Sequence, residues 1–362
     1  MKHALIIVGE EIQINESFLH YVFSEYESYY GELGVVRYIA DNDMDLPFSI
    51  ENAARSFDVV TIVANDENFA TTSKILATLT NDNIELKFDT FVPSRALKFE
   101  KDSVVIALNR AKINLVRAIP TKKLPPFITD ESQKCFFFNL LDIDKNSARA
   151  MLEPMSSTYN VTTWFSDVAP SLTFVKAKTD KFGQIGGFID AASELFGSKL
   201  VPEKSIVEYL AKRLIAKNLT ITFAESCTAG LAAAKLGAIS GVSEVFAGSV
   251  VTYANRIKHA WLDVEDEILE TKGAVSAECV EQMCRGAMEL CQSDFAIAIS
   301  GIAGPNGGSE EKPVGTVFIG AANKERVVTR RLSLAGDRNY IREQSALGAY
   351  ALLIRSFREQ LA

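Results

Sequence analysis

The sequence predicts an α/β protein with more than one domain, and three observations support this. Its 362 residues exceed the size of most single domains. In the first third of the chain, short apolar and β-branched runs alternate with helical segments, as in a parallel sheet with helical crossovers. The composition, with 48% hydrophobic and 23% charged residues, is that of an ordinary globular protein.

The first domain is expected at residues 1–125, where strands and helices alternate. Its predicted strands are Ala4–Val8, Val35–Ala40 and Val59–Ala64, and its predicted helices include Glu16–Tyr30 and Ile50–Phe57. The proline pair in Leu124–Phe127 interrupts this pattern and indicates the end of the domain.

A small α+β module is expected at residues 126–199 and a larger α/β domain at residues 200–362. The module has predicted strands at Val161–Phe165 and Leu172–Ala177 and a helix at Phe182–Phe196. The predicted strands of the last domain are Thr220–Ala224, Val245–Tyr253, Phe295–Ser300, Gly315–Ala321 and Arg326–Leu334. Its predicted helices are Ser205–Lys217, Thr228–Ile239, Ala277–Leu290 and Asp337–Glu359. The domain therefore alternates strands and helices before it ends in a strand pair and a long helix.

Composition and charge argue against several functions. The formal net charge is −8 and no basic face is visible, so nucleic acid is not an expected partner. No apolar run reaches the roughly 20 residues of a membrane helix, and the first apolar stretch is too short for a signal peptide, so a cytoplasmic location is expected. Five cysteines without a CxxC motif and three histidines argue against a structural zinc site, and no metal or cofactor is expected.

Four polar clusters follow one another in the last 160 or so residues. AESCTAG (Ala224–Gly230) places Ser226, Cys227 and Thr228 between a buried strand and a helix, where they either bind an anion or cap the helix. The other three clusters are GVS ending at Ser243, TYANRIK (Thr252–Lys258) and SGIAGPNGGSEEKPVGT (Ser300–Thr316). Their hydroxyls, lysine and glycine loop are groups that a small amide-hydrolysing site needs.

The residues of these clusters admit structural roles as well. Lys258 acts as a base only if burial or positive charge lowers its pKa, and it is otherwise a solvated lysine. Ser243, between a helix and a strand, is a cap unless a base lies beside it. The glycine loop lets backbone amides approach a phosphate, although it is not a P-loop, and Arg338 in GDR suits a phosphate contact. A serine-histidine triad in this domain would depend on His259.

With these motifs, residues 200–362 resemble the CinA (competence/damage-inducible) family. AESCTAG, VTYANRIK, GAVS (Gly273–Ser276), the glycine loop and GDR all match, and one family glycine is Ala229 here. The resemblance implies an amidohydrolase that converts nicotinamide mononucleotide to nicotinate mononucleotide and ammonia in pyridine nucleotide salvage. It also implies a homodimer with a small-molecule nucleotide as its substrate.

The resemblance assigns roles to residues by position in these motifs. Ser243 falls on the nucleophile position and Lys258 on the base position, with Ser226 and Tyr253 as supporting catalytic residues. The substrate-binding positions are Cys227, Thr228, Ser300, Gly301, Gly304, Gly307, Gly308, Thr316 and Arg338. One alternative within the same chemistry stays open, namely a Cys227 thiolate nucleophile with Glu225 and Lys258.

The first domain resembles the family's N-terminal domain, which is similar to molybdopterin-binding proteins and cleaves ADP-ribose in some members. The family's glycine-rich loop after the third strand is replaced by Val63–Lys74, which has no glycine, and a later proline-glycine turn by Leu140–Met151. A loop without glycine cannot bring its amides as close to a diphosphate. The domain is therefore predicted to be degenerate and to serve structure or assembly. The alternative functions are a scaffold or binding protein with vestigial activity, or an ADP-ribose pyrophosphatase of the N-terminal domain.

Overall fold

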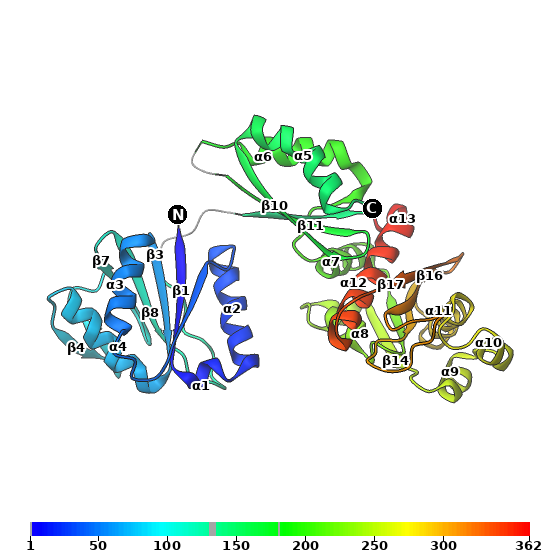
Figure 1. The fold of residues 1–362 in the computed structure, drawn as a ribbon, viewed down its shortest axis with the longest axis horizontal. Helices are drawn as coiled ribbons and strands as arrows, with labels where there is room; N and C mark the ends of the chain where they lie inside the picture. Colours follow the sequence, from blue (N-terminus) through cyan, green and yellow to red (C-terminus); the bar gives the residue numbers. More distant parts are fainter. Residues whose placement is uncertain (1, 130–134, 180–181) are drawn as a thin grey trace. The chain divides into compact units, whose positions relative to one another are not determined.

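The computed structural model describes residues 2–129, 135–179 and 182–362, and the chain divides into two compact units (Figure 1). The first unit is Met1–Cys135 and the second is Phe136–Ala362. Several sheets with helices on their faces confirm the predicted α/β fold class with more than one domain. The predicted boundaries at residues 125 and 199 stay predictions. In the described residues, no helix has both the length and the apolar character that crossing a membrane requires.

The first unit contains a six-stranded sheet covered by helices on both faces. In spatial order its strands are β2 (Val35–Ile39), β1 (His3–Val8), β3 (Val59–Ala64), β8 (Ala111–Arg117), β7 (Ser103–Leu108) and β6 (Lys98–Glu100). The first four are mutually parallel and include the three strands predicted from the sequence, β1, β2 and β3. By contrast, β7 and β6 pair antiparallel because hairpins join them to their neighbours. Two strands form a separate ribbon, β4 (Ile84–Lys87) and β5 (Thr90–Pro93).

Two apolar cores hold these helices on the sheet. Tyr26 and Tyr30 of α2 pack on one face and Phe69 of α4 packs on the other. The helices of this unit are α1 (Glu10–Gln13), α2 (Glu16–Tyr30), α3 (Leu46–Ser56) and α4 (Asp66–Leu79). Asparagine side chains cap two of these helices, because Asn15 accepts from the backbone N–H of Phe18 and Asn65 from that of Asn68.

The second unit begins with a four-stranded antiparallel sheet in the order β10-β11-β9-β12. Its elements follow the chain order β9 (Phe136–Leu141), α5 (Lys145–Tyr159), β10 (Val161–Ala169), β11 (Leu172–Thr179), α6 (Ile185–Phe196), η1 (Gly197–Lys199) and β12 (Leu200–Val201). Helices α5 and α6 cover the same face, where Phe138, Val175 and Phe188 form the core (Figure 1). Strand β12 extends this sheet two residues beyond residue 199, where the predicted module ends.

The rest of the second unit is built on a five-stranded sheet in the order β14-β13-β15-β16-β17. Its strands are β13 (Ile221–Glu225), β14 (Phe246–Val251), β15 (Phe295–Gly301), β16 (Thr316–Asn323) and β17 (Val327–Ser333). Its helices are α7 (Ile206–Lys217), α8 (Leu231–Gly237), η2 (Val242–Glu244), α9 (Asn255–Leu262), α10 (Asp266–Thr271), α11 (Ala277–Cys291), α12 (Arg338–Ser356) and α13 (Arg358–Leu361). The first three strands are parallel, and β16 and β17 continue the sheet as antiparallel strands.

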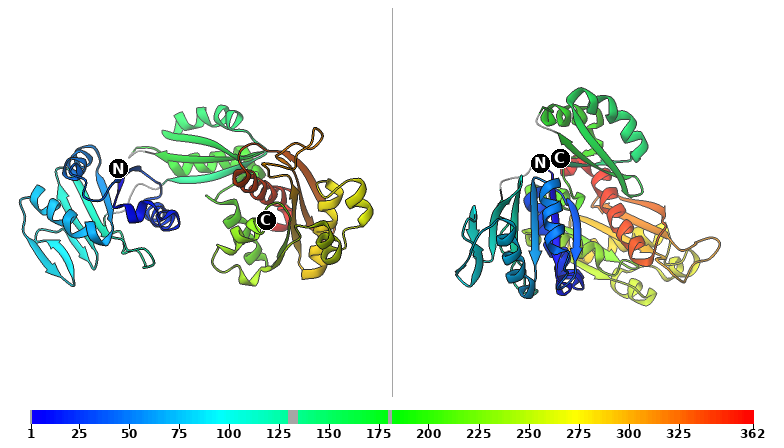
Figure 2. Two further views of the ribbon diagram at one scale, coloured as in Figure 1. Left: turned by 60° about the horizontal axis from the view of Figure 1, so that its bottom comes forward. Right: turned by 60° about the vertical axis from the view of Figure 1, so that its left-hand side comes forward.

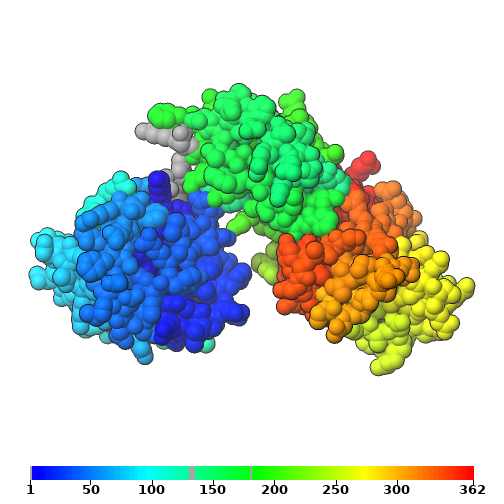
Figure 3. Space-filling view, viewed as in Figure 1, coloured from blue at the N-terminus to red at the C-terminus, as the bar shows by residue number. Residues whose placement is uncertain are grey.

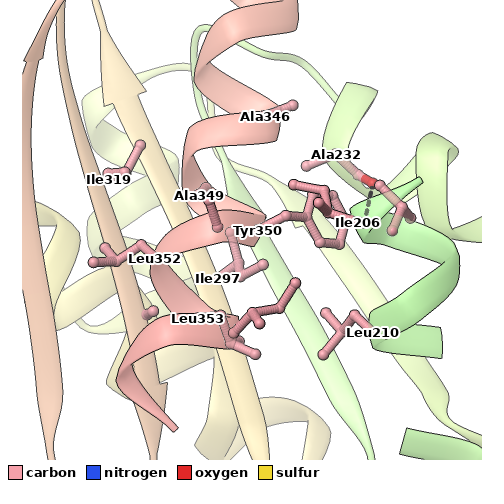
Figure 4. Packing of buried hydrophobic residues seen from close by; sticks show 14 of the residues in the cluster. Ile206, Leu210, Ala232, Ile297, Ile319, Ala346, Ala349, Tyr350, Leu352 and Leu353 are labelled. Atoms are coloured by element: carbon pink, nitrogen blue, oxygen red, sulfur yellow. Dashed lines mark hydrogen bonds between the residues drawn. The ribbon is translucent and has the colours of Figure 1, made fainter. Parts of the chain in front are cut away.

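The main core of this domain lies between α12 and the five-stranded sheet, and both views of Figure 2 show α12 (red) along it. Tyr350 is fully buried there, and its hydroxyl donates to the carbonyl of Ala232 at 2.7 Å (Figure 4). In Figure 3 the four-stranded module (green) adjoins the orange and red part of this domain. Arg355 of α12 binds both carboxylate oxygens of Asp142 in the module at 2.8 and 2.9 Å.

Candidate active site

The predicted motifs meet where the parallel strands of the five-stranded sheet end. Ser226 follows β13, Thr252 follows β14 and Ser300 lies at the end of β15. Because these strands are parallel and in register, their carboxyl ends lie at one edge of the sheet. Antiparallel β16 begins at this edge, so both ends of the glycine loop also lie there.

Lys258 is the central residue of this site. It lies on α9, is only 1% exposed and is one of the largest fully buried side chains. Its Nζ contacts three oxygens, the hydroxyl of Ser226 at 3.1 Å and the carbonyls of Thr252 at 2.8 Å and Tyr253 at 3.1 Å. No carboxylate of the described residues forms an ion pair with it. Burial without an ionic partner disfavours the ammonium form, and this desolvation lowers the pKa of Lys258.

The three oxygens match the three N–H groups of an ammonium, and an uncharged amine can also make all three contacts. A neutral Lys258 has two N–H groups, which match the carbonyls of Thr252 and Tyr253, and one lone pair, which can accept the hydroxyl proton of Ser226. Ser226 is 8% exposed, and its own backbone N–H donates to the carbonyl of Ile299 at 2.9 Å. The serine and the lysine are therefore both held by backbone contacts, as a nucleophile and its base must be.

The predicted pairing of Ser243 with Lys258 is wrong in this structure. Ser243 lies exposed in η2, before β14 begins, whereas Thr252 and Lys258 follow the end of that strand. The six residues of β14 span about 20 Å at the usual rise of a strand. Ser243 therefore lies at the opposite edge of the sheet, and the hydroxyl beside the lysine is that of Ser226.

The alternative nucleophile, Cys227, lacks the environment of a thiolate. Its side chain is buried, and desolvation raises its pKa to about 11, so it is a thiol at neutral pH. Glu225, the acidic member of that alternative, is fully buried and accepts from the backbone N–H groups of Ala232 and Ala233 at 3.1 and 2.8 Å. It therefore satisfies the unpaired amides at the start of α8.

Tyr253 contributes its carbonyl to Lys258, while its side chain is 56% exposed and binds an arginine. Arg338, in the first turn of α12, donates to the hydroxyl of Tyr253 at 3.0 Å and to the carbonyl of Gly304 at 2.7 Å. Arg338 thus links the end of β14 to the glycine loop.

The glycine loop is anchored at its base by backbone hydrogen bonds. Ile302 and Gly315 donate to carbonyls at the other end of the loop, and Ser309 closes a turn with Lys312. Gly304, Gly307 and Gly315 have φ of +77°, +94° and +92°, values that favour glycine. A Cβ on Gly315 would lie 1.9 Å from the carbonyl oxygen of Leu334, so only glycine fits there.

The other predicted substrate-binding residues fall into two groups. Ser300 and Thr316 are buried at the sheet edge, and the Ser300 hydroxyl donates to the carbonyl of Ala274 at 2.6 Å. Gly301 lies beside them at the end of β15, whereas Gly307 and Gly308 are exposed in the loop. Substrate binding by these residues stays a prediction.

Arg342 was missed in the sequence, whereas Thr228 was among the predicted substrate-binding residues. Arg342, one turn after Arg338 on α12, donates to the carbonyl of Thr228 at 2.7 Å and so anchors the loop that follows Ser226. The Thr228 hydroxyl is fully buried and has no hydrogen-bond partner in the described residues. The helical spacing of four between the two arginines was the available signal.

Two backbone donors remain beside the serine. No carbonyl of the described residues accepts from the N–H groups of Cys227 or Thr228. These N–H groups directly follow Ser226 and can stabilise negative charge at a substrate oxygen. The described residues contain no group of three or more His, Cys, Asp or Glu side chains placed to hold a metal ion.

The corresponding strand ends of the first unit are filled by side chains. The Nδ2 of Asn68 donates to Asp41 at 2.5 Å and to Asn65 at 2.7 Å. A Cβ on Gly9 would lie 2.6 Å from the side chain of Asn65, which therefore lies directly over the end of β1. The glycine-free segment after β3 thus forms the capped start of α4.

Sequence comparisons agree with the motifs. Residues 203–357 match a family described as the CinA C-terminal domain. The chain belongs to the CinA family. It is 46% identical over 153 residues to a CinA-like protein of Fervidobacterium nodosum, covering 42% of this chain and 38% of that protein. It is 41% identical over 193 residues to a CinA-like protein of Pseudothermotoga lettingae, covering 52% of this chain and 47% of that protein.

The solved structure of a competence/damage-inducible protein from Agrobacterium tumefaciens is 39% identical, with a TM-score of 0.40. The alignment covers 41% of this chain and 94% of that one. The matches with the first two curated CinA relatives span less than half the length of those proteins.

Proposed function

We propose that this chain hydrolyses the carboxamide of nicotinamide mononucleotide to nicotinate mononucleotide and ammonia. The observation that carries the proposal is the 3.1 Å contact between the buried Nζ of Lys258 and Oγ of Ser226. A serine beside a lysine of lowered pKa is a nucleophile with its general base, the pair that acyl transfer requires. The substrate itself is inferred from the family resemblance of the motifs.

The reaction follows from the positions of the two groups. Neutral Lys258 takes the hydroxyl proton as Ser226 Oγ attacks the carboxamide carbon. The carbon–nitrogen bond then breaks, and the Lys258 ammonium returns the proton to the leaving ammonia. Water, deprotonated by the same lysine, cleaves the resulting ester and releases the carboxylic acid and Ser226.

Polar groups beside the serine support the same reaction. The backbone N–H groups of Cys227 and Thr228 can bind the oxyanion, and the buried hydroxyl of Thr228 can bind the amide. Arg338 and the glycine loop are proposed to hold the 5′-phosphate, which binds equally in the ground state and the transition state.

The test is ammonia release from nicotinamide mononucleotide by the full chain, with the acid product identified by chromatography. Wild-type protein should release one ammonia per acid formed, and Ser226→Ala should release none. A wild-type protein that forms neither product would contradict the proposal. Free nicotinamide is the control substrate, because it has the amide but lacks the phosphate that Arg338 is proposed to bind.

We propose further that the first unit serves structure or assembly rather than diphosphate hydrolysis. The Asp41–Asn68–Asn65 contacts support this, because they occupy the strand ends with a carboxylate and two amides. Incubation of the full chain with ADP-ribose and divalent metal ions should yield no AMP. The homodimer expected from the resemblance stays a prediction.

A further inference from the structure

Arg342 of α12 holds the loop that carries the proposed nucleophile. Its Nη2 donates to the carbonyl of Thr228 at 2.7 Å, and its Nη1 donates to the uncharged side chain of Asn339 at 3.1 Å. No carboxylate of the described residues forms an ion pair with Arg342, although the next residue of α12, Glu343, pairs with a lysine. A positive charge without a counterion among the described residues therefore binds the loop.

Anchoring alone does not account for an arginine at this position. Its Nε is buried and has no hydrogen-bond partner in the described residues, which costs free energy in the folded chain. Two other contacts already join α12 to α8. Glu343 pairs with Lys235 at 2.5 Å, and the Tyr350 hydroxyl donates to the carbonyl of Ala232 at 2.7 Å (Figure 4).

The peptide group that Arg342 binds is linked by hydrogen bonds back to the serine. The N–H of the Thr228–Ala229 peptide donates to the carbonyl of Ser226 at 3.0 Å. This bond closes a four-residue turn, in which Ala229 has a φ of +50°. The carbonyl of Ser226 shares its own peptide with the N–H of Cys227, one of the two proposed oxyanion donors.

These bonds all point in one direction and form a relay. A peptide group that accepts a hydrogen bond at its carbonyl is polarised, and its N–H becomes a stronger donor. A charged donor polarises its acceptor more than a neutral one, because hydrogen bonds from ionised groups are about twice as strong. Polarisation therefore passes from Arg342 through the Thr228–Ala229 and Ser226–Cys227 peptides to the N–H of Cys227.

The loop does not depend on the arginine for its shape. The Thr228 carbonyl also accepts from the N–H of Leu231 at 3.2 Å. A carbonyl oxygen has two lone pairs, so both bonds form at once. Loss of Arg342 would leave this carbonyl bonded and the turn closed while removing the charged donor.

We propose that Arg342 is a positioning residue that strengthens the Cys227 N–H as an oxyanion donor through this relay. The inference rests on the proposed function, because the oxyanion forms only when Ser226 attacks a substrate. Charge develops on the substrate oxygen in the transition state and not on binding. Loss of Arg342 therefore lowers kcat and leaves KM unchanged.

The first test is hydrolysis of nicotinamide mononucleotide by Arg342→Met. Removal of an oxyanion donor typically lowers kcat by about 10²- to 10³-fold, so weakening one through the relay should lower kcat by roughly 5- to 50-fold, with KM within about twofold. Arg342→Lys keeps a charged donor and should recover part of the loss. Arg326→Met is the matched control, because Arg326 also donates to a backbone carbonyl, that of Ser356 at 2.9 Å, and it should keep the wild-type kcat.

A second readout does not depend on nicotinamide mononucleotide. A small alkyl fluorophosphonate reacts with an activated serine: the bond between Ser226 Oγ and phosphorus forms, fluoride leaves and Lys258 takes the proton. The phosphoryl oxygen gains negative charge in this step, so the same N–H donors stabilise it. Labelling of Ser226, followed by mass spectrometry, should be roughly 5- to 50-fold slower in Arg342→Met. It should keep the wild-type rate in Arg326→Met and in Glu343→Gln, which loosens the contact of α12 with α8 alone.

Two results would overturn the relay. One is wild-type kcat and labelling in an Arg342→Met variant whose circular dichroism and urea midpoint match wild type. The other is an equal loss in Glu343→Gln, which would assign the effect to helix packing. If Arg342→Met does not fold, Arg342→Gln, which keeps an uncharged donor, is measured against the same expectation.

The two readouts separate this inference from the proposed substrate. Labelling of Ser226 without hydrolysis of nicotinamide mononucleotide would contradict the substrate, and the labelling rates of the variants would then decide on the relay. A wild-type protein that shows neither reaction would overturn the relay together with the proposed function.

Discussion

Lys258→Met removes the amine while keeping an unbranched side chain of similar length, and it should abolish most of the hydrolysis. The amine contacts the Ser226 hydroxyl directly, so its loss removes the general base. Loss of general base catalysis typically reduces kcat by about 10²- to 10⁴-fold. The wild-type rate should rise with pH through the lowered pKa of Lys258 and then level off, and this rise should be absent from the residual rate of the variant.

Lys258→Met should also change how the free energy of unfolding depends on pH. An unfolded lysine has a pKa of about 10.4, and burial lowers the pKa of Lys258 in the folded chain. Between the two values the unfolded chain binds more protons, so the free energy of unfolding rises with pH by up to about 1.4 kcal/mol per unit. Below the folded pKa, the wild type carries the full cost of a buried ammonium.

The measurement is urea denaturation of wild type and Lys258→Met at a series of pH values. The difference in unfolding free energy should favour wild type increasingly as pH rises through this window and be constant below it. The unpaired carbonyls of Thr252 and Tyr253 add a cost of roughly 1–3 kcal/mol each to the variant, independent of pH. A difference that does not change with pH would refute the account of Lys258 as a lysine whose pKa is lowered by burial.

Three further substitutions test other parts of the site. Cys227→Ala should retain wild-type kcat in the ammonia assay, because a thiol with a pKa of about 11 is not the nucleophile at neutral pH. Glu225→Gln should lower the unfolding free energy by about 1.5–3 kcal/mol in urea denaturation, because a charged acceptor of two helix amides is lost. Arg338→Ala should raise KM for nicotinamide mononucleotide by roughly 10- to 100-fold with little change in kcat, since the arginine is proposed to bind the phosphate. Activity loss in the first, unchanged stability in the second or an unchanged KM in the third would each contradict the role given.

Much of the fold could be predicted from local pattern. Buried strands such as Val59–Ala64 and Phe295–Ser300 are continuous apolar runs, and long helices such as Glu16–Tyr30 are amphipathic, so each is encoded by its own residues. The antiparallel β7–β8 hairpin and the two-residue β12 were missed. Only two residues separate β7 from β8, so this hairpin is local, whereas β12 pairs with β9, a strand distant in the sequence.

The sequence predicted the residues of the candidate site, but it did not predict which serine lies beside Lys258. Ser226 follows β13, Tyr253 follows the neighbouring parallel strand β14, and Lys258 lies on α9. Motif order alone does not say which hydroxyl reaches the amine of Lys258. Ser243 precedes β14 and Lys258 follows it, and a sheet separates the two ends of a strand by its full length. Assigning strand directions first would have selected Ser226, because catalytic groups gather at the carboxyl ends of parallel strands.

The nucleophile is identified by comparing Ser226→Ala with Ser243→Ala in the ammonia-release assay. Ser226→Ala should lose about 10⁴-fold or more in kcat, equal to about 5.4 kcal/mol of transition-state stabilisation. Ser243→Ala, an exposed site at the other edge of the sheet, should match wild type in rate and stability. Full activity in Ser226→Ala together with an inactive, folded Ser243→Ala would show that the hydroxyl bound to Lys258 is not the nucleophile.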